Sequence, residues 1–197
     1  MPRYKRIMLK LSGSAIAGDK GFGFSPEALN HITREALSIA DLGIQVCITV
    51  GGGNIFRGRV ADDWKIDRVE ADNMGMLATV INAVLLRAAL SAKSDKETRV
   101  LSAFPINTFA EPFIRLRALR HLDRGYMVVF AGGITNNMWQ GEEYPNATSA
   151  KQVDSNTLIH DCGFATGCGR APTTSSTLAA CTRARRTRSL CHLCAQW

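Results

Sequence analysis

Residues 44–58 read IQVCITVGGGNIFRG, and this stretch decides the fold. A nearly continuous apolar run precedes three glycines, as a strand buried on both faces precedes a tight turn. A second apolar run, YKRIMLKLSG at residues 4–13, also ends in small residues. Backbone N–H groups exposed at such turns, with Lys10 and Arg57 beside them, suit an anion that carries several phosphates. The chain therefore reads first as a phosphoryl-transfer enzyme.

Helix and strand patterns alternate around these two turns. Ser25 and Pro26 predict the start of a helix that Gly43 ends, between strands at residues 6–12 and 44–50. A second helix is expected from Asn73 to about Leu90, with Asp72 as a candidate N-cap.

The same alternation continues to residue 133. Strands are expected at residues 99–103 and 126–131, and Pro112 is expected to open a basic helix between them. Strand–helix–strand repeats predict an α/β fold: a three-layer, doubly wound, mainly parallel sheet. Ligands of such sheets bind at the carboxyl ends of the strands. The turns at Gly13, residues 51–53 and residues 132–133 are therefore expected to converge on one cleft.

The composition fits a soluble protein with one sizeable core. The 197 residues are 46% hydrophobic and 21% charged. We expect no stretch that approaches the roughly 18 apolar residues needed to cross a membrane, which favours a cytoplasmic protein. The net charge of +7 permits a nucleic-acid partner. Basic residues before residue 150 are mostly balanced by acidic ones, however, so small anionic substrates explain that part equally well.

Five motifs together resemble the bacterial-type uridylate (UMP) kinases of the amino-acid kinase superfamily. They span about the first two thirds of the chain: KLSG (residues 10–13), GFG (21–23), GGGNIFRG (51–58), ADNMGMLAT (71–79), and AEPFIR with RHL (110–115 and 120–122). The first and third motifs suit several kinases of the superfamily. FRG followed by DNMGMLAT is more particular to the UMP kinases.

The resemblance implies magnesium-dependent transfer of the γ-phosphoryl group of ATP to UMP, a reaction that depends mostly on alignment and charge stabilisation. Lys10 and Arg57 would be the catalytic cations, and Gly52 and Asp72 would contact UMP. No residue is assigned to a metal. The positions that match the ATP side of the family site are Lys10, Leu11, Ser12, Gly13, Gly53 and Arg57.

The resemblance also implies a partner and an effector. Residues 18–23 match a loop that contacts activating GTP in some family members, and the family forms homohexamers built from dimers. The helix expected near Asp72 resembles an element of that assembly.

Each candidate residue also has a purely structural interpretation. Lys10 at a strand end could be simply solvated, and the three glycines could form an ordinary turn. Arg57 could pair with Asp62 or Asp63 for little stability. Asp72 as an N-cap is compatible with a contact to the nucleoside, since a carboxylate accepts hydrogen bonds but repels phosphate.

The chain departs from the family pattern after Gly133, so we expect two regions: a kinase-like nucleotide-binding region at residues 1–133 and a divergent tail at 134–197. The family's paired threonines are missing there, and the composition turns to Cys and Arg without periodicity. Cys191 and Cys194 have zinc-like spacing, but a second pair is missing, so incidental cysteines are the better interpretation.

Two explanations for the tail stay open. The first is that a frameshift replaced the family's ATP-binding half with this tail. Translation of the other reading frames would test this explanation. Alternatively, it is an appended basic module that contacts RNA or DNA, which salt-dependent binding would reveal.

Two further functions stay open beside UMP kinase, whose activity in this chain the altered tail puts in question. The chain could be another kinase of the superfamily that acts on carbamate or an amino-acid carboxylate. It could also bind nucleotides or nucleic acid without phosphoryl transfer.

Overall fold

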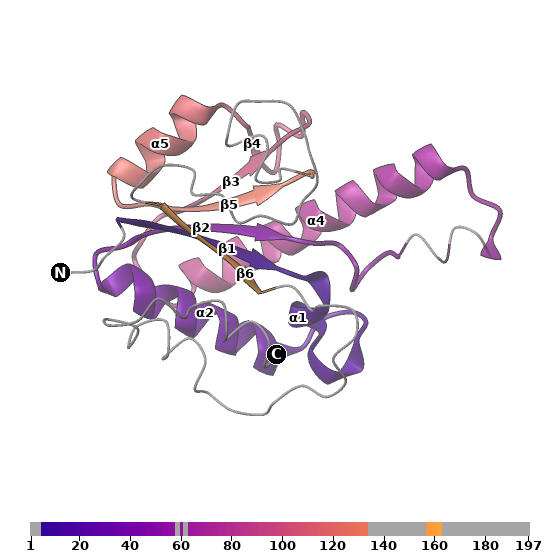
Figure 1. Ribbon diagram of the computed structural model, residues 1–197, viewed down its shortest axis with the longest axis horizontal. Helices are drawn as coiled ribbons and strands as arrows, with labels where there is room; N and C mark the ends of the chain where they lie inside the picture. Colours follow the sequence, from indigo (N-terminus) through magenta and orange to yellow (C-terminus); the bar gives the residue numbers. More distant parts are fainter. Residues whose placement is uncertain (1–4, 58–59, 61–62, 134–156, 163–197) are drawn as a thin grey trace.

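The computed structural model describes residues 5–57, 60, 63–133 and 157–162 (Figure 1). Its centre is a six-stranded sheet with the order β4-β3-β5-β2-β1-β6, and all of the strand pairs are parallel. The predicted α/β fold with a mainly parallel sheet is confirmed. The strands are β1 (Arg6–Leu11), β2 (Gln45–Val50), β3 (Thr98–Ser102), β4 (Glu111–Pro112), β5 (Met127–Ala131) and β6 (Thr157–Cys162).

Helices cover both faces of the sheet (Figure 1). One face carries α1 (Gly13–Ala17), α2 (Pro26–Asp41) and α4 (Arg68–Ser91), which contact one another, and the other carries α5 (Arg115–Asp123). A short 3-10 helix, η1 (Gly18–Lys20), follows α1. The predicted three-layer arrangement is therefore confirmed.

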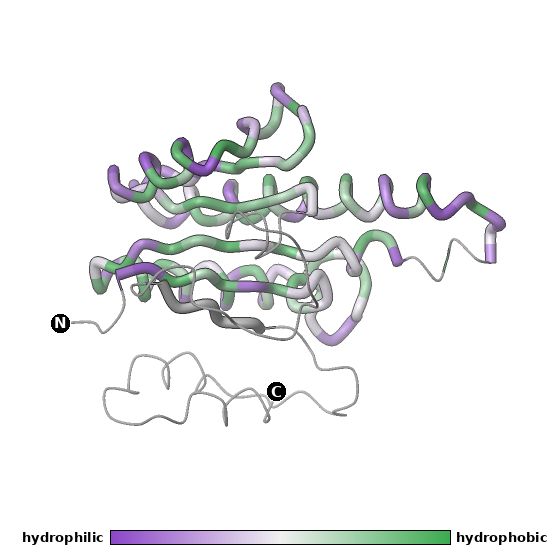
Figure 2. Tube along the Cα trace, turned by 45° about the horizontal axis from the view of Figure 1, so that its top comes forward, coloured by the Kyte–Doolittle hydropathy of each residue, from purple (hydrophilic) through white to green (hydrophobic). Residues whose placement is uncertain are grey.

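Alternating side chains of the strands fill two separate cores. Along β1, Ile7 and Leu9 pack into the core beneath α2 and α4, whereas Met8 packs into the core beneath α5. In β5, Val129 and Phe130 divide in the same way. This division follows from the strand period of two and explains why these strands are apolar throughout. Figure 2 shows the resulting concentration of hydrophobic residues in the central strands.

The start and end of α2 match the sequence signals. The Ser25 hydroxyl accepts a hydrogen bond from the N–H of Ala28 (3.2 Å), and Pro26 occupies the first turn. Gly43 follows the helix with a φ of 76°, a conformation that glycine adopts without a steric penalty.

The start of α4 differs from the prediction. The helix begins at Arg68, and Asp67 is the N-cap, since its carboxylate accepts a hydrogen bond from the N–H of Val69 (2.9 Å). The prediction of Asp72 as an N-cap is therefore wrong: Asp72 lies in the second turn. Asp67 and Asp72 are equally good caps by residue type, and the sequence pattern alone did not separate them.

Pro112 does not open the basic helix. It lies in β4, and the chain continues to pair with β3 through the N–H of Phe113, which donates to the Ser102 carbonyl (2.8 Å). The helix α5 therefore begins only at Arg115. The sequence analysis also assigned no element to residues 157–162, which form β6 beside β1.

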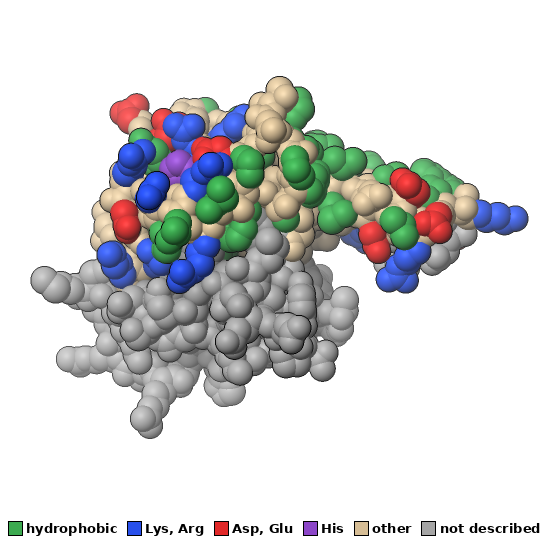
Figure 3. Space-filling view, turned by 90° about the horizontal axis from the view of Figure 1, so that it is seen from above, with side chains coloured by type: hydrophobic (Ala, Val, Ile, Leu, Met, Phe, Trp, Pro, Cys, Tyr) green, Lys and Arg blue, Asp and Glu red, His purple; other side chains and the backbone are tan. Residues whose placement is uncertain are grey.

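α4 is long and apolar enough, by length and composition alone, to cross a membrane, with a mean hydropathy of 1.6 over 18 residues. The expectation that no stretch approaches this limit was therefore wrong. Part of the helix contacts α2, β2, β3 and β5, as a core helix of a soluble protein does. Its outer end projects from the body of the molecule (Figure 3).

Candidate functional site

The strands β1, β2 and β5 are neighbours in the sheet and run parallel, so their carboxyl ends meet at one edge. Gly13, residues 51–53 and residues 132–133 follow these ends directly. The three predicted glycine-bearing turns therefore lie at one edge of the sheet, and their convergence on a single cleft stays a prediction. In α/β sheets this edge is where ligands bind.

The turns after β1 and β2 are in direct contact. The N–H of Gly51 donates to the Leu11 carbonyl (2.9 Å). A Cβ atom on Gly13 would lie 2.5 Å from Oδ1 of Asn54 and 2.6 Å from the nitrogen of Gly53. Glycine at position 13 is thus required for the close approach of the two turns.

Gly52 joins the same turn to α4. A Cβ atom on this glycine would lie 2.7 Å from both the Cβ of Ala78 and the carbonyl oxygen of Gly75. Gly53 differs, because a Cβ atom there meets no described atom within 4 Å. Among the described residues, the turn is therefore packed against the helix at Gly52, whereas a methyl group at position 53 would meet no neighbour.

The turn after β5 is also held by α4. The N–H of Gly132 donates to the hydroxyl of Thr79 (2.8 Å), which itself donates to the carbonyl of Met76 (2.6 Å). Gly132 has a φ of 74°, and a Cβ atom would lie 2.7 Å from the ring of Phe104. One helix therefore contacts the ends of two adjacent strands.

The two predicted cations lie at this edge in different settings. Lys10 is the last residue but one of β1 and pairs in register with Thr49, and it is partly exposed. Arg57 is exposed, and its guanidinium donates to the carbonyls of Gly53 (Nε, 2.8 Å) and Gly21 (Nη2, 3.0 Å). Arg57 thus links the turn after β2 to the loop at residues 18–23. Of the two acids expected as surface partners, Asp63 forms no ion pair with Arg57 within the described part of the chain, and Asp62 lies outside it.

Ser12 and Leu11 occupy the step from β1 into α1. The Ser12 hydroxyl accepts a hydrogen bond from the N–H of Ala15 (3.2 Å) and so caps α1. Leu11 contributes its carbonyl to Gly51, as described above. Both residues position the backbone that leads to Gly13.

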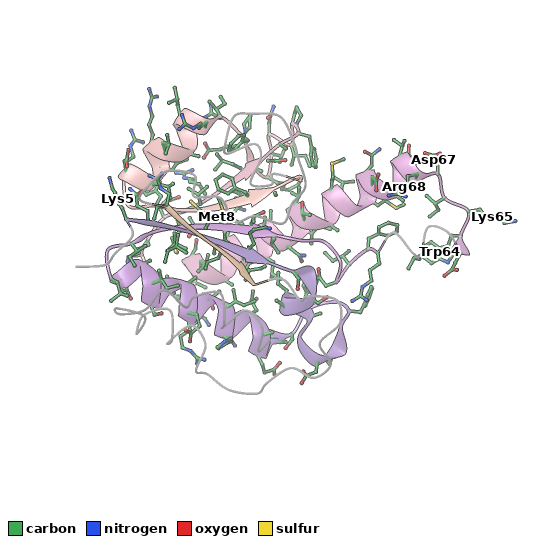
Figure 4. The ribbon with its side chains drawn as sticks, in the orientation of Figure 1. Lys5, Met8, Trp64, Lys65, Asp67 and Arg68 are labelled. Carbon is green, nitrogen blue, oxygen red and sulfur yellow. The ribbon has the colours of Figure 1, made fainter. Side chains whose placement is uncertain are left out.

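Asp72 is exposed on α4, where its carboxylate lies 3.8 Å from Nε of Arg68. Asp72 and Thr79 are seven residues apart and therefore lie on the same side of the helix, the side that holds Gly132. Figure 4 labels Asp67 and Arg68 at the outer end of this helix, about one turn beyond Asp72. The structure thus brings Lys10, Gly52 and Arg57 to one edge and places Asp72 further out on the adjoining helix.

Three polar residues that build the site were not predicted from the sequence. Asn54 and Asn82 are fully buried and hydrogen-bonded to each other, and Thr79 holds Gly132. A polar residue within the apolar pattern of α4 was the signal available for Asn82 and Thr79, because buried polar side chains require specific partners.

Titration and metal chemistry add little to this site. Burial raises the pKa of the Cys47 thiol, within β2, to about 12. Within the described part of the chain, no three His, Cys, Asp or Glu side chains form a cluster fit to hold a metal ion. A cavity of about 380 Å³ beside α5, lined by residues such as Glu111 and His121, lies away from the glycine turns. The edge of the sheet therefore stands as the candidate site through its backbone geometry.

Comparison with known proteins agrees with this geometry. The sequence profile of the Amino acid kinase family matches residues 5–159. The uridylate kinases of Frankia casuarinae and Frankia alni are 46% and 45% identical to the chain over 159 residues, which cover 81% of the chain and 61% and 62% of those proteins. The chain thus spans about three fifths of the length of these relatives.

Solved structures of UMP kinases are also similar to the chain. The UMP kinase of Bacillus anthracis superposes with a TM-score of 0.65 at 56% identity, covering 67% of the chain and 54% of that protein. The UMP kinase of Ureaplasma parvum gives a TM-score of 0.62 at 30% identity, covering 66% and 55%. The resemblance inferred from the sequence motifs is confirmed.

Proposed function

Because this chain belongs to the amino acid kinase family, we propose that it is built for phosphoryl transfer from ATP to UMP. An oxygen of the UMP phosphate forms a bond to the γ-phosphorus of ATP. The bond from that phosphorus to the β-phosphate oxygen breaks, which gives UDP and ADP. The similarity to uridylate kinases along 81% of the chain supports this substrate pair.

One observation carries the proposal: the turns after β1 and β2 touch at Gly13 and Gly53, where any side chain on Gly13 would collide with the neighbouring turn. Such contact holds backbone N–H groups of both turns at one place. Two phosphate groups that react with each other must be held in this way, since alignment supplies most of the catalysis.

The site residues have distinct proposed roles. Lys10 would neutralise charge on the moving phosphoryl group, and Arg57 would act beside the open position at Gly53 on the ATP side. Leu11, Ser12 and Gly13 would complete the ATP side through their backbone. Gly52 would adjoin the UMP side, with Asp72 accepting a hydrogen bond from the nucleoside.

The geometry fits a polyphosphate, because Arg57 donates to the carbonyl of Gly53 and Lys10 lies near the carboxyl end of the neighbouring strand β1. Mg²⁺, when bound, would stabilise the negative charge that develops on the phosphate groups.

The proposal extends to the pathway, cellular location, assembly and regulation of the chain. We infer a role in pyrimidine nucleotide biosynthesis in the cytoplasm, assembly into homohexamers, and an allosteric response to GTP. The division into residues 1–133 and 134–197 also stays a prediction. The family profile matches residues 5–159, and β6 pairs with β1.

The direct test is transfer of labelled γ-phosphate from ATP to UMP by the purified full chain. We expect UDP formation, and we expect the Lys10→Met variant to lose at least about a hundredfold in kcat, given what one group aimed at the transition state contributes. Arg34→Met, an exposed cation on α2, is the control. Binding of both nucleotides without any UDP formation would contradict kinase activity in this chain and favour a binding protein.

Replacing the acceptor tests the substrate class. With γ-labelled ATP we expect a labelled product only when UMP is supplied, whereas carbamate and free amino acids in place of UMP are expected to give none. Phosphorylation of either of the latter would assign the chain to another branch of the superfamily.

A further inference from the structure

Asn54 and Asn82 form a reciprocal amide pair beneath the glycine turn. Nδ2 of Asn82 donates to Oδ1 of Asn54 (2.7 Å), and Nδ2 of Asn54 donates to Oδ1 of Asn82 (3.1 Å). Both side chains have no exposed surface. The pair therefore lies in a medium where each unmade hydrogen bond is costly.

The second donor of each amide holds the backbone of a different segment. Asn82 donates to the carbonyl of Gly51 (2.7 Å), and Asn54 donates to the carbonyl of Gly23 (2.9 Å). The N–H of Gly23 donates back to the carbonyl of Asn54 (2.8 Å). Since an amide offers two donors and one acceptor oxygen, every donor of the pair is used.

The pair thus ties three segments to α4. These are the end of β2 at Gly51, the turn that contains Asn54, and the loop that ends at Gly23. Oδ1 of Asn54 also lies where a side chain on Gly13 would be, so the pair borders the turn after β1 as well.

We propose that Asn82, acting through Asn54, is a positioning residue: it fixes the orientation of the peptide groups at residues 51–53 for the nucleotide phosphates. This inference rests on the proposed function. The neighbouring buried side chains of α4 are apolar, for example Ala83 and Leu86. An apolar residue at position 82 would pack among them without the need for polar partners, so the amide is explained by the carbonyl of Gly51 that it holds.

The test uses Asn82→Asp, which keeps the size of the side chain and removes its donors. Asn82→Ser is the second variant, in case the aspartate prevents folding. Leu86→Ala is the matched control, because Leu86 is a fully buried core residue one turn further along the same helix and makes none of the amide hydrogen bonds of the pair. For each full-length protein we would measure thermal unfolding, hydrogen exchange, and the Kd for ATP and for UMP.

We expect both Asn82 variants to speed amide exchange at residues 51–56 and 21–25. We expect their nucleotide Kd to rise by about tenfold to a hundredfold, since a displacement of about 1 Å at a reacting site has effects of this size. Leu86→Ala should lower the unfolding temperature and leave the Kd within about threefold of wild type.

Two results would overturn the inference: unchanged exchange in these segments, or a rise in Kd no larger than that of Leu86→Ala at equal loss of stability. A wild-type chain that binds neither nucleotide would refute the proposed function instead. The exchange measurement would then still decide whether Asn82 fixes the two loops.

Discussion

Gly13 faces Asn54 so closely that a single added methyl group at position 13 would lie 2.5 Å from the side-chain oxygen of Asn54. The turns after β1 and β2 therefore have their present separation only because residue 13 lacks a side chain. This contact joins the two halves of the proposed ATP side.

We expect Gly13→Ala to lower the free energy of unfolding by about 1–3 kcal/mol, the usual effect of overpacking, and to weaken ATP binding. Urea denaturation and calorimetric titration check the two effects. Gly75→Ala is the control, because a Cβ at Gly75 meets no described atom within 4 Å. In the interior of α4 that change should raise stability by about 0.5–1 kcal/mol. Equal stability of Gly13→Ala and wild type would show that the turns separate at no cost.

Substitution of Arg57 tests whether its hydrogen bonds to two carbonyl groups, and not its charge alone, connect the loops. Arg57→Lys keeps the positive charge but cannot reproduce the separate hydrogen bonds to Gly53 and Gly21. We expect the Kd for ATP to rise about tenfold and amide exchange at residues 21–25 to accelerate. Arg34→Lys, on the exposed surface of α2, should change neither. An unaltered Kd in Arg57→Lys would assign Arg57 a purely electrostatic role.

Substitution of Asp72 should affect the KM for UMP but hardly the free energy of unfolding. Its ion pair with Arg68 is exposed and 3.8 Å long, so Asp72→Ala should change the free energy of unfolding by less than about 0.5 kcal/mol. If Asp72 accepts a hydrogen bond from UMP, the KM for UMP should rise at least about tenfold, because an unpaired polar group on the ligand is costly. Glu70→Ala, an exposed acid on the same helix, is the control, and matching KM values for the two variants would remove Asp72 from the site.

Cys47 should resist alkylation in the folded protein. Burial raises the pKa of its thiol to about 12, so at pH 8.5 the reactive thiolate is scarce and the sulfur is covered. Mass spectrometry after iodoacetamide treatment should find Cys47 modified only when urea is present. This group's contribution to stability is complete below the thiol's unfolded pKa of about 8.5 and declines as the pH rises toward 12. Modification of folded Cys47 as fast as a free thiol would contradict its burial in β2.

Local signals predicted much of the fold. Ser25, Pro26 and Gly43 bound α2 because each acts on its own neighbours in the chain. The N-cap of α4 and the place of Pro112 were predicted wrongly for the opposite reason. Asp67 is the N-cap of α4, and no local sequence pattern distinguished it from Asp72. Pro112 lies in β4 because β4 pairs with β3, and this pairing is a tertiary contact.

The glycine turns of the site were predicted for a similar reason, since each follows its own strand. Their partners were not. The hydrogen bonds of Asn54 to Asn82 and of Thr79 to Gly132 join residues 28 and 53 positions apart. Such pairs depend on how α4 crosses the sheet, and the periodicity of a single helix does not reveal that crossing.

β6 protects one edge of β1 from pairing with other molecules. It occupies the side of β1 that β2 leaves uncovered, and so it satisfies the peptide groups along that margin of the sheet. In a shortened polypeptide without residues 157–162, β1 would become an exposed edge strand. Such a strand can pair with a strand of another molecule and so lead to aggregation. The solubility of the chain during synthesis would thus depend on β6.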